Sequence, residues 1–272
     1  MNRKIRSVLL WILSFLLMAV FAIYQRMTGP TYPVNSSATI EGVALDYHFP
    51  RSQDSDKDAM VEVETKDPDI KGTFHFRRYK SHDKWTTIPM ERVDGKLRAS
   101  IPRQPAAGKV MYKVDIEKNG TVKRITEEPV IIRFKGSVPD QVLYPHIFFI
   151  FLAMVFSIRT GIEALLKGKY TYLYTIITTL LLLLGGMILG PIVQKYAFDA
   201  YWTGWPFGHD LTDNKTLVSF ILWIIAFFVL RKNKENRSWP IIASLALIAV
   251  YLIPHSVLGS ELDYTAIENN QP

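Results

Sequence analysis

Five long stretches of this sequence carry almost no charge, and they constrain the fold more than any other feature. They cover residues 7–24, 142–157, 172–193, 216–230 and 239–254. An α-helix needs roughly 17–25 apolar residues to cross the hydrocarbon core of a bilayer, so each stretch is close to the length of one membrane span. The composition hides this pattern, because the value of 49% hydrophobic residues averages these stretches with a polar region between them. The sequence therefore predicts an integral membrane protein with five spans.

Basic clusters between the apolar stretches predict the orientation. They lie at residues 3–6, 167–169 and 231–237. All three fall on one side if every stretch spans, and loops rich in Lys and Arg stay in the cytoplasm. We therefore expect a plasma (inner) membrane protein with a cytoplasmic N-terminus and an extracytoplasmic C-terminus. A cleaved signal peptide is the alternative for the first stretch, but its length and its lack of a small-x-small cleavage site favour an uncleaved anchor over residues 1–25.

The composition and motifs exclude several classes of function. The chain has no cysteine, which removes disulfides, thiolate zinc sites and iron–sulfur clusters. The net charge of +7 is accounted for by the clusters on the predicted cytoplasmic side, so no nucleic-acid partner is expected. Neither a Gly-x-Ser-x-Gly motif nor a phosphate-binding loop is present. We therefore expect a protein that is not an enzyme.

Residues 33–136, between the first two apolar stretches, have the pattern of β-strands. Alternating or β-branched and aromatic segments occupy residues 59–65, 73–79, 96–101, 109–116 and 130–134. Asp94-Gly95 and Asn119-Gly120 are dipeptides typical of hairpin turns. The spacing predicts an extracytoplasmic, antiparallel β-sandwich.

Three segments within this region carry a family resemblance. They are WTTIPM at residues 85–90, GKLRASIP at 95–102 and GKVMYKV at 108–114. Together they resemble the second half of immunoglobulin or fibronectin-type-III-like modules of bacterial envelope proteins. The resemblance implies an Ig-like sandwich in the periplasm but no particular activity, since such modules host many functions.

The predicted fold class is thus an α+β membrane protein. Its parts are the anchor at residues 1–25, the Ig-like β-sandwich at 33–136, a four-helix transmembrane domain at 141–254 and an extracytoplasmic acidic tail at 255–272.

Histidines gather at the predicted outer boundary of the membrane. His146 and His255 could supply the two axial ligands of a haem, and His209, Asp210 and Asp213 could hold a divalent metal. No HExxH or other ligand spacing accompanies them. Histidines beside a proline are also common as water-facing or capping groups, so both interpretations stay open.

The loop between the third and fourth stretches has two interpretations as well. In the structural one, Trp202 and Trp205 belong to the aromatic belt at the headgroups and Asp213 or Asn214 caps the next helix. In the functional one, the loop folds back over the bundle, because irregular backbone at membrane depth must be buried in protein or line a wet cavity. Its aromatic side chains would then be buried, and His209 would lie near the other two histidines.

The apolar stretches themselves carry few signals. Gly186 and Gly190 form a small-xxx-small pattern, which lets two helix backbones approach closely, either within this chain or between two copies. Ionisable residues are nearly absent from the centres of the stretches, so a pump or proton-coupled transporter is not expected.

These observations favour a non-enzymatic, multi-pass membrane protein that presents its β-sandwich for protein–protein or subunit contact. The expected partners are the lipid bilayer and another protein or a second copy of the chain. The alternative is a membrane redox subunit with haem or a divalent metal at the outer boundary; the sequence does not decide the cofactor.

Overall fold

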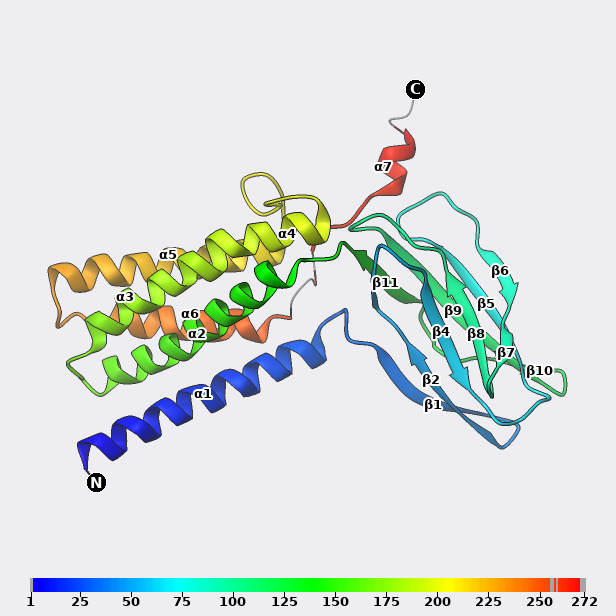
Figure 1. Ribbon diagram of the computed structural model, residues 1–272, viewed down its shortest axis with the longest axis horizontal. Coiled ribbons are helices and arrows are strands. Elements are labelled where there is room, and N and C mark those ends of the chain that lie inside the picture. Colours follow the sequence, from blue (N-terminus) through cyan, green and yellow to red (C-terminus); the bar gives the residue numbers. More distant parts are fainter. Residues whose placement is uncertain (1, 255–256, 258, 270–272) are drawn as a thin grey trace. The chain divides into compact units, whose positions relative to one another are not determined.

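The computed structural model describes residues 2–254, 257 and 259–269 of the chain (Figure 1). The chain divides into two compact units. The helical unit comprises Met1–Pro30, Val138–Tyr196 and Ala200–Gly259, and the β-rich unit comprises Thr31–Ser137, Ala197–Asp199 and Ser260–Pro272. The protein therefore combines helices and sheets, as the sequence predicts, with the β-rich region lying between the first and second long helices.

The helical unit contains the apolar stretches. Its elements are α1 (Arg3–Thr28), α2 (Asp140–Leu165), α3 (Thr171–Leu182), the π-helical segment η1 (Leu183–Leu189), α4 (Gly190–Phe198), α5 (Leu211–Lys232) and α6 (Ser238–Leu252). Four helical segments in the described part of the chain are long and apolar enough to cross a membrane: Lys4–Thr28, Asp140–Leu165, Thr171–Phe198 and Leu211–Lys232. They coincide with the first four predicted spans, the third of which runs continuously through α3, η1 and α4.

The fifth predicted span is a shorter helix. α6 has 15 residues, which at 1.5 Å per residue is roughly 22 Å. Two prolines account for its length. Pro240 lies in the first turn, where a missing backbone N–H is tolerated, and Ile253 is extended because Pro254 disfavours the helical region for the residue before it.

The core of the helical unit is formed mainly by α2, α3, α5 and α6. Met154, Leu182, Trp223 and Leu247 are buried there. α1 buries the smallest share of the four long helices and exposes a row of large apolar side chains. Such a surface is compatible with lipid but not with water.

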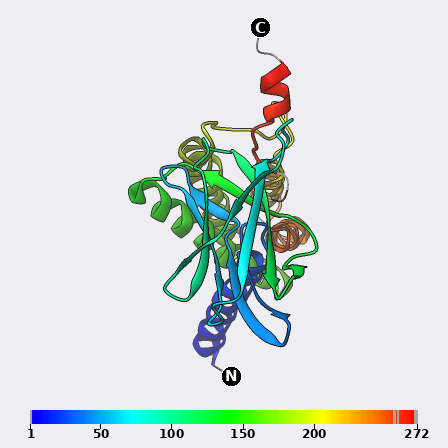
Figure 2. The same cartoon turned by 90° about the vertical axis from the view of Figure 1, so that its right-hand side faces the viewer.

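The β-rich unit contains two sheets (Figure 2). The first has the order β1 (Val34–Ile40), β2 (Val43–Phe49), β4 (Ala59–Glu64), β8 (Lys96–Ile101) and β7 (Glu91–Val93). The second has the order β3 (Ser52–Asp54), β11 (Val130–Lys135), β9 (Lys109–Lys118), β5 (Lys71–Arg78) and β6 (Thr86–Pro89), with β10 (Thr121–Arg124) also pairing with β9. Inward side chains of both sheets, among them Leu45, Phe74 and Tyr112, share one core.

One strand pairing differs from the predicted antiparallel arrangement. β3 pairs in parallel with β11, whereas the other paired strands of the described chain are antiparallel. The chain leaves the first sheet after Phe49, passes Pro50 and Arg51, and joins the edge of the second sheet at Ser52. A short strand that switches sheets in this way need not reverse its direction, which is why the pair is parallel.

The hairpin turns follow the predicted dipeptides. Asp94 and Gly95 have φ of 50° and 74°, and Asn119 and Gly120 have φ of 50° and 81°. Positive φ at both central residues is the signature of the type I′ turn, which Asn-Gly and Asp-Gly favour. Glu41-Gly42, with φ of 44° and 76°, forms a third turn of this kind that the sequence did not predict, because glutamate is an unusual first residue for it.

Candidate functional site

Asp213, in the first turn of α5, organises the loop that precedes this helix. Its carboxylate accepts hydrogen bonds from the backbone N–H groups of Thr203 at 2.7 Å and Gly204 at 2.9 Å, and from the Gln194 side chain at 3.1 Å. Only 8% of Asp213 is exposed. Buried amides need partners, so this carboxylate fixes the path of the loop.

Two neighbours of Asp213 extend the same arrangement. Asp210 is the N-cap of α5 and accepts a hydrogen bond from the N–H of Thr212 at 2.8 Å. Asn214 accepts one from the N–H of Trp205 at 2.6 Å. The loop is therefore ordered by Asp213 and Asn214 of α5, but the predicted cap is wrong: Asp210, not Asp213 or Asn214, is the N-cap, because the helix begins at Leu211.

The aromatic side chains of this loop do not bury themselves over the bundle, which corrects one expectation. Tyr201, Trp205 and Phe207 are 61%, 69% and 83% exposed, and His209 is exposed too. The Trp202 indole donates to the carbonyl of Trp205 at 3.0 Å. Because α5 already satisfies the loop amides, burial of the rings is not needed to hold the loop, and the rings are free to face headgroups in the manner of an aromatic belt.

His146 is held at the junction of α2 and η1. Its Nδ1 lies 2.9 Å from the carbonyl oxygen of Gly185, a residue of the π-helical segment. Single-turn π-helical segments are frequent at functional sites, but here the Gly185 carbonyl accepts the backbone N–H of Gly190 and is also contacted by the histidine.

The glycines of η1 and α4 differ in how closely other helices approach them. A Cβ at Gly185 would lie 2.9 Å from the backbone nitrogen of Ile150 in α2, and one at Gly186 would lie 2.9 Å from the Thr216 side chain in α5. At Gly190 the nearest atom would be 3.6 Å away, an ordinary contact. Gly186 thus packs within this chain, and Gly185 is a close approach that the small-xxx-small pattern does not include.

A haem or metal site stays a prediction. His255, one of its two proposed haem ligands, lies outside the described residues. Within residues 2–254, 257 and 259–269, no group of three or more His, Cys, Asp or Glu side chains could hold a metal ion. Asp210 and Asp213 instead serve the backbone of their own loop.

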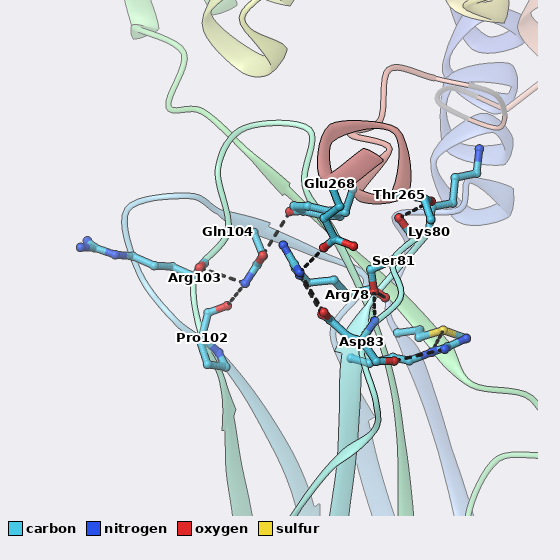
Figure 3. Close-up of polar contacts among 12 residues, drawn as sticks. Arg78, Lys80, Ser81, Asp83, Pro102, Arg103, Gln104, Thr265 and Glu268 are labelled. Atoms are coloured by element: carbon cyan, nitrogen blue, oxygen red, sulfur yellow. Dashed lines mark hydrogen bonds and ion pairs between the residues drawn. The ribbon is translucent and has the colours of Figure 1, made fainter. Parts of the chain in front are cut away.

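A second polar cluster joins the C-terminal segment to the β-rich unit (Figure 3). Arg78 makes a bidentate contact with Asp83 at 2.7 and 2.8 Å, and its Nη2 also donates to Glu268 of α7 (Tyr264–Asn269) at 2.6 Å. Its guanidinium lies over the ring of Tyr264 at 4.6 Å. The hydrogen bonds to Asp83 raise the pKa of Arg78 above its ordinary value, so it stays charged at every physiological pH.

Glu261 anchors the start of the same segment. Its carboxylate accepts hydrogen bonds from Lys80 and Lys109. Burial raises the pKa of Glu261, but the two lysines together outweigh burial and lower it below the ordinary value. We call the contacts of Glu261, Tyr264, Thr265 and Glu268 with the β-rich unit the C-terminal contact; the sequence showed only that the tail is acidic, not that it binds these cations.

β1 is the long edge strand of the first sheet, and its outer side is contacted by Lys123 at the Thr39 carbonyl. It has seven residues without charge or proline, whereas the other edge strands of the described chain, β3, β6, β7 and β10, have three, four, three and four residues. In an antiparallel ladder, the backbone N–H and C=O groups of every second residue point away from the partner strand. The Thr39 carbonyl accepts a hydrogen bond from Lys123 and not from β2, so Thr39 and every second residue before it have outward-pointing backbone groups. Asn35 and Ser37 belong to this set and are exposed.

Two buried charges near the end of α2 escaped the sequence analysis. Arg159 is 2% exposed and Glu163 is 7% exposed, and they form an i,i+4 ion pair at 2.8 Å. The available signal was the Arg-x-x-x-Glu spacing directly after the second apolar stretch. Charged side chains inside a membrane segment are costly, so they are usually paired with one another or functional.

Comparisons with protein-family models, curated proteins and solved structures found no match to this chain.

Proposed function

We propose that this chain is a non-enzymatic, multi-pass membrane protein whose extracytoplasmic, Ig-like β-sandwich binds another protein through the edge of strand β1. Three observations support the proposal: the two sheets share one core, the β-rich unit is inserted between two apolar helices, and one long edge strand lacks the features that usually block pairing.

The path of the chain supports five membrane crossings. Glu261 and Glu268 bind Lys80, Lys109 and Arg78, so the C-terminal segment ends on the same side of the membrane as the β-rich unit. The chain crosses once, through α1, before the β-rich unit, and it must cross an even number of times between that unit and Glu261. The total number of crossings is therefore odd. The four long helices supply an even number, and α6 is the remaining apolar helix of the described chain. Its deficit in length is of the size that local thinning of the bilayer accommodates.

The basic clusters support the orientation. In Figure 1 the N-terminus of α1, the α2–α3 connection and the α5–α6 connection lie at one end of the helical unit. Lys167, Lys169 and Lys234 lie in the two connections. The positive-inside rule assigns that end to the cytoplasm of the inner membrane, which leaves the β-rich unit outside.

The outer edge of β1 is the single observation that carries the binding function. An exposed edge strand offers a row of unpaired N–H and C=O groups, and natural proteins usually block it with charge, proline or a short length. The edges β3, β6 and β7 are short or contain proline, whereas β1 has seven residues without charge or proline and is contacted by Lys123 at one end, at Thr39. An extended segment of a partner protein could add to the sheet there, with main-chain hydrogen bonds supplying the affinity.

The test places a photo-crosslinking residue at Asn35 in the full chain in its native membrane, with the same residue at the exposed Val122 as a control. We expect a protein adduct from position 35 that is absent from position 122. Ser37→Pro should abolish the adduct, because it removes an outward N–H without removing a bond to β2. An adduct that survives Ser37→Pro, or none at position 35, would contradict the proposal.

A further inference from the structure

A cavity of about 370 Å³ opens at the end of the helical unit that contains the basic connections. It lies between the start of α1, the end of α2 and the connection from α2 to α3. Its polar lining includes Arg6, Arg159, Glu163, Lys167, Lys169 and the backbone around Tyr170. The volume is within the range of small-molecule sites, roughly 300–1,000 Å³.

Arg159 is the built element of this cavity. Its guanidinium is stacked between aromatic rings, 5.6 Å from the centre of Trp11 and 5.3 Å from that of Tyr174. Nη1 lies 2.8 Å from a Glu163 oxygen, but Nε and Nη1 make no hydrogen bond of good geometry to any described residue. Arg159 lines the cavity, and a guanidinium carries five N–H donors. A ligand would be contacted by those N–H groups that face the cavity, because Nε and Nη1 themselves are fully buried.

Glu163 serves to position these groups. One oxygen pairs with Arg159, and the other accepts a hydrogen bond from the backbone N–H of Tyr170 at 3.2 Å. The carboxylate therefore ties the α2–α3 connection to the arginine. It leaves Arg6, Lys167 and Lys169, all exposed, around the mouth of the cavity, so the lining carries more positive than negative charge.

We propose that this cavity binds a phosphate-bearing anionic group, with Arg159 as the buried ligand and Lys167 and Lys169 at its mouth. The planar fork of a guanidinium matches the oxygens of a phosphate. Basic pockets between membrane helices on the cytoplasmic side are sites for anionic lipid headgroups.

The surroundings of the cavity favour a lipid as the source of the phosphate. Leu10 lines the cavity, and the neighbouring side chains of α1, Ile5, Val8 and Leu9, are exposed and apolar. A headgroup in the cavity would thus have its acyl chains beside an apolar helix face. A free phosphate would make no use of that face, so the two sources can be separated by experiment.

The test uses the purified full chain in detergent. Native mass spectrometry measures the retention of an anionic phosphatidylglycerol against zwitterionic phosphatidylcholine, and a parallel titration measures the binding of inorganic phosphate. The variant is Lys167→Gln with Lys169→Gln. The matched control is Lys232→Gln with Lys234→Gln, which removes the same charge from the other basic connection at this end without touching the cavity lining.

We expect preferential retention of the anionic lipid. The cavity variant should weaken it by about fivefold for each lysine, the factor that corresponds to about 1 kcal/mol per basic residue at an anionic membrane surface, whereas the control should change it by less than half as much. Arg159→Lys keeps the charge but removes the fork and should also weaken retention. Should this variant fail to fold, the lysine pair alone decides, because both side chains are exposed.

The phosphate arm identifies the source of the bound group. Binding of inorganic phosphate that the cavity variant weakens, without lipid selectivity, would retain the proposed chemistry and assign it to a soluble ligand. The proposal is overturned if neither probe binds, or if the cavity variant and the control reduce binding equally. These results do not depend on whether β1 binds a protein.

Discussion

Replacement of Asp213 by alanine should destabilise the helical unit strongly and loosen the loop before α5. The carboxylate accepts four hydrogen bonds, two of them from the backbone of Thr203 and Gly204. A hydrogen bond to a charged group contributes about 1.5–3 kcal/mol, and a buried amide left unpaired costs about 1–3 kcal/mol. Water can reach part of a loop at the membrane boundary, so we take the lower end for two amides and expect a loss of about 3 kcal/mol.

The assay is thermal unfolding of the full chain in detergent, combined with limited proteolysis of the loop. A loss of this size corresponds to a decrease in Tm of roughly 6–12 °C for a unit of 150–250 residues, and the loop should become a preferred cleavage site. His209→Ala is the matched control, because this side chain is exposed in the same loop; it should change Tm by less than about 2 °C, as surface substitutions usually do.

The two results separate the structural and functional interpretations of the loop. If Asp213→Ala leaves Tm and the cleavage pattern unchanged, the hydrogen bonds around Asp213 do not hold the loop, and the argument fails. If His209→Ala destabilises the chain as much as Asp213→Ala does, the exposed position assigned to this histidine is wrong.

Three further predictions concern the topology, the β-rich unit and the C-terminal contact. A reporter fused after Pro139 or at the C-terminus should be active only outside the cytoplasm, and one fused within residues 232–236 only inside; a cytoplasmic C-terminus would exclude α6 as a span. Residues 31–137, expressed alone, should give a β-type far-UV circular dichroism spectrum and a cooperative melt, because their two sheets share one core; absence of either result would show that this core does not suffice. Because the pKa of Glu261 is lowered, its contribution to the C-terminal contact is complete above the ordinary glutamate value of 4.5 and is lost as the pH falls through the lowered pKa, so protease cleavage of the tail should rise below that pH. Glu261→Gln should weaken the contact by about 1–2 kcal/mol and so raise cleavage at neutral pH. Cleavage that depends on neither the pH nor this substitution would refute the contact.

The elements that could be predicted from the sequence are those with a strong local cause. The four long apolar helices follow from length and composition, and the hairpins at Asp94-Gly95 and Asn119-Gly120 follow from the positive φ that these residues tolerate. Strands β4, β8 and β9 follow from alternation, with buried and half-buried residues in turn along β8 and most of β9. Each of these signals lies within one continuous segment of the sequence.

The features that could not be predicted depend on contacts between distant residues. The parallel pairing of β3 with β11 joins residues near Ser52 to residues near Arg133, and the binding of Glu261 by Lys80 and Lys109 spans more than 150 residues. A local pattern contains no record of such pairs. The buried Arg159–Glu163 pair was local, but its charges lie just beyond the end of the apolar stretch, where they resemble the solvated residues of a loop.

The buried polar side chains at the two ends of the helical unit differ in how many of their donors and acceptors have hydrogen-bond partners. This difference is a guide to function. At the end that begins α5, the Asp213 carboxylate is occupied by amides of its own loop and its neighbours cap a helix, which is what a structural role requires. At the opposite end, Arg159 is as deeply buried but has nitrogens without a hydrogen-bond partner among the described residues. Glu163 compensates the charge of Arg159 at 2.8 Å, but native proteins rarely leave N–H groups of a buried side chain without a hydrogen bond of good geometry. Arg159 is therefore the better candidate for contact with a bound anion, as proposed above, and the residues singled out from the sequence at the other end, His209 and Asp210, belong to the ordered loop before α5.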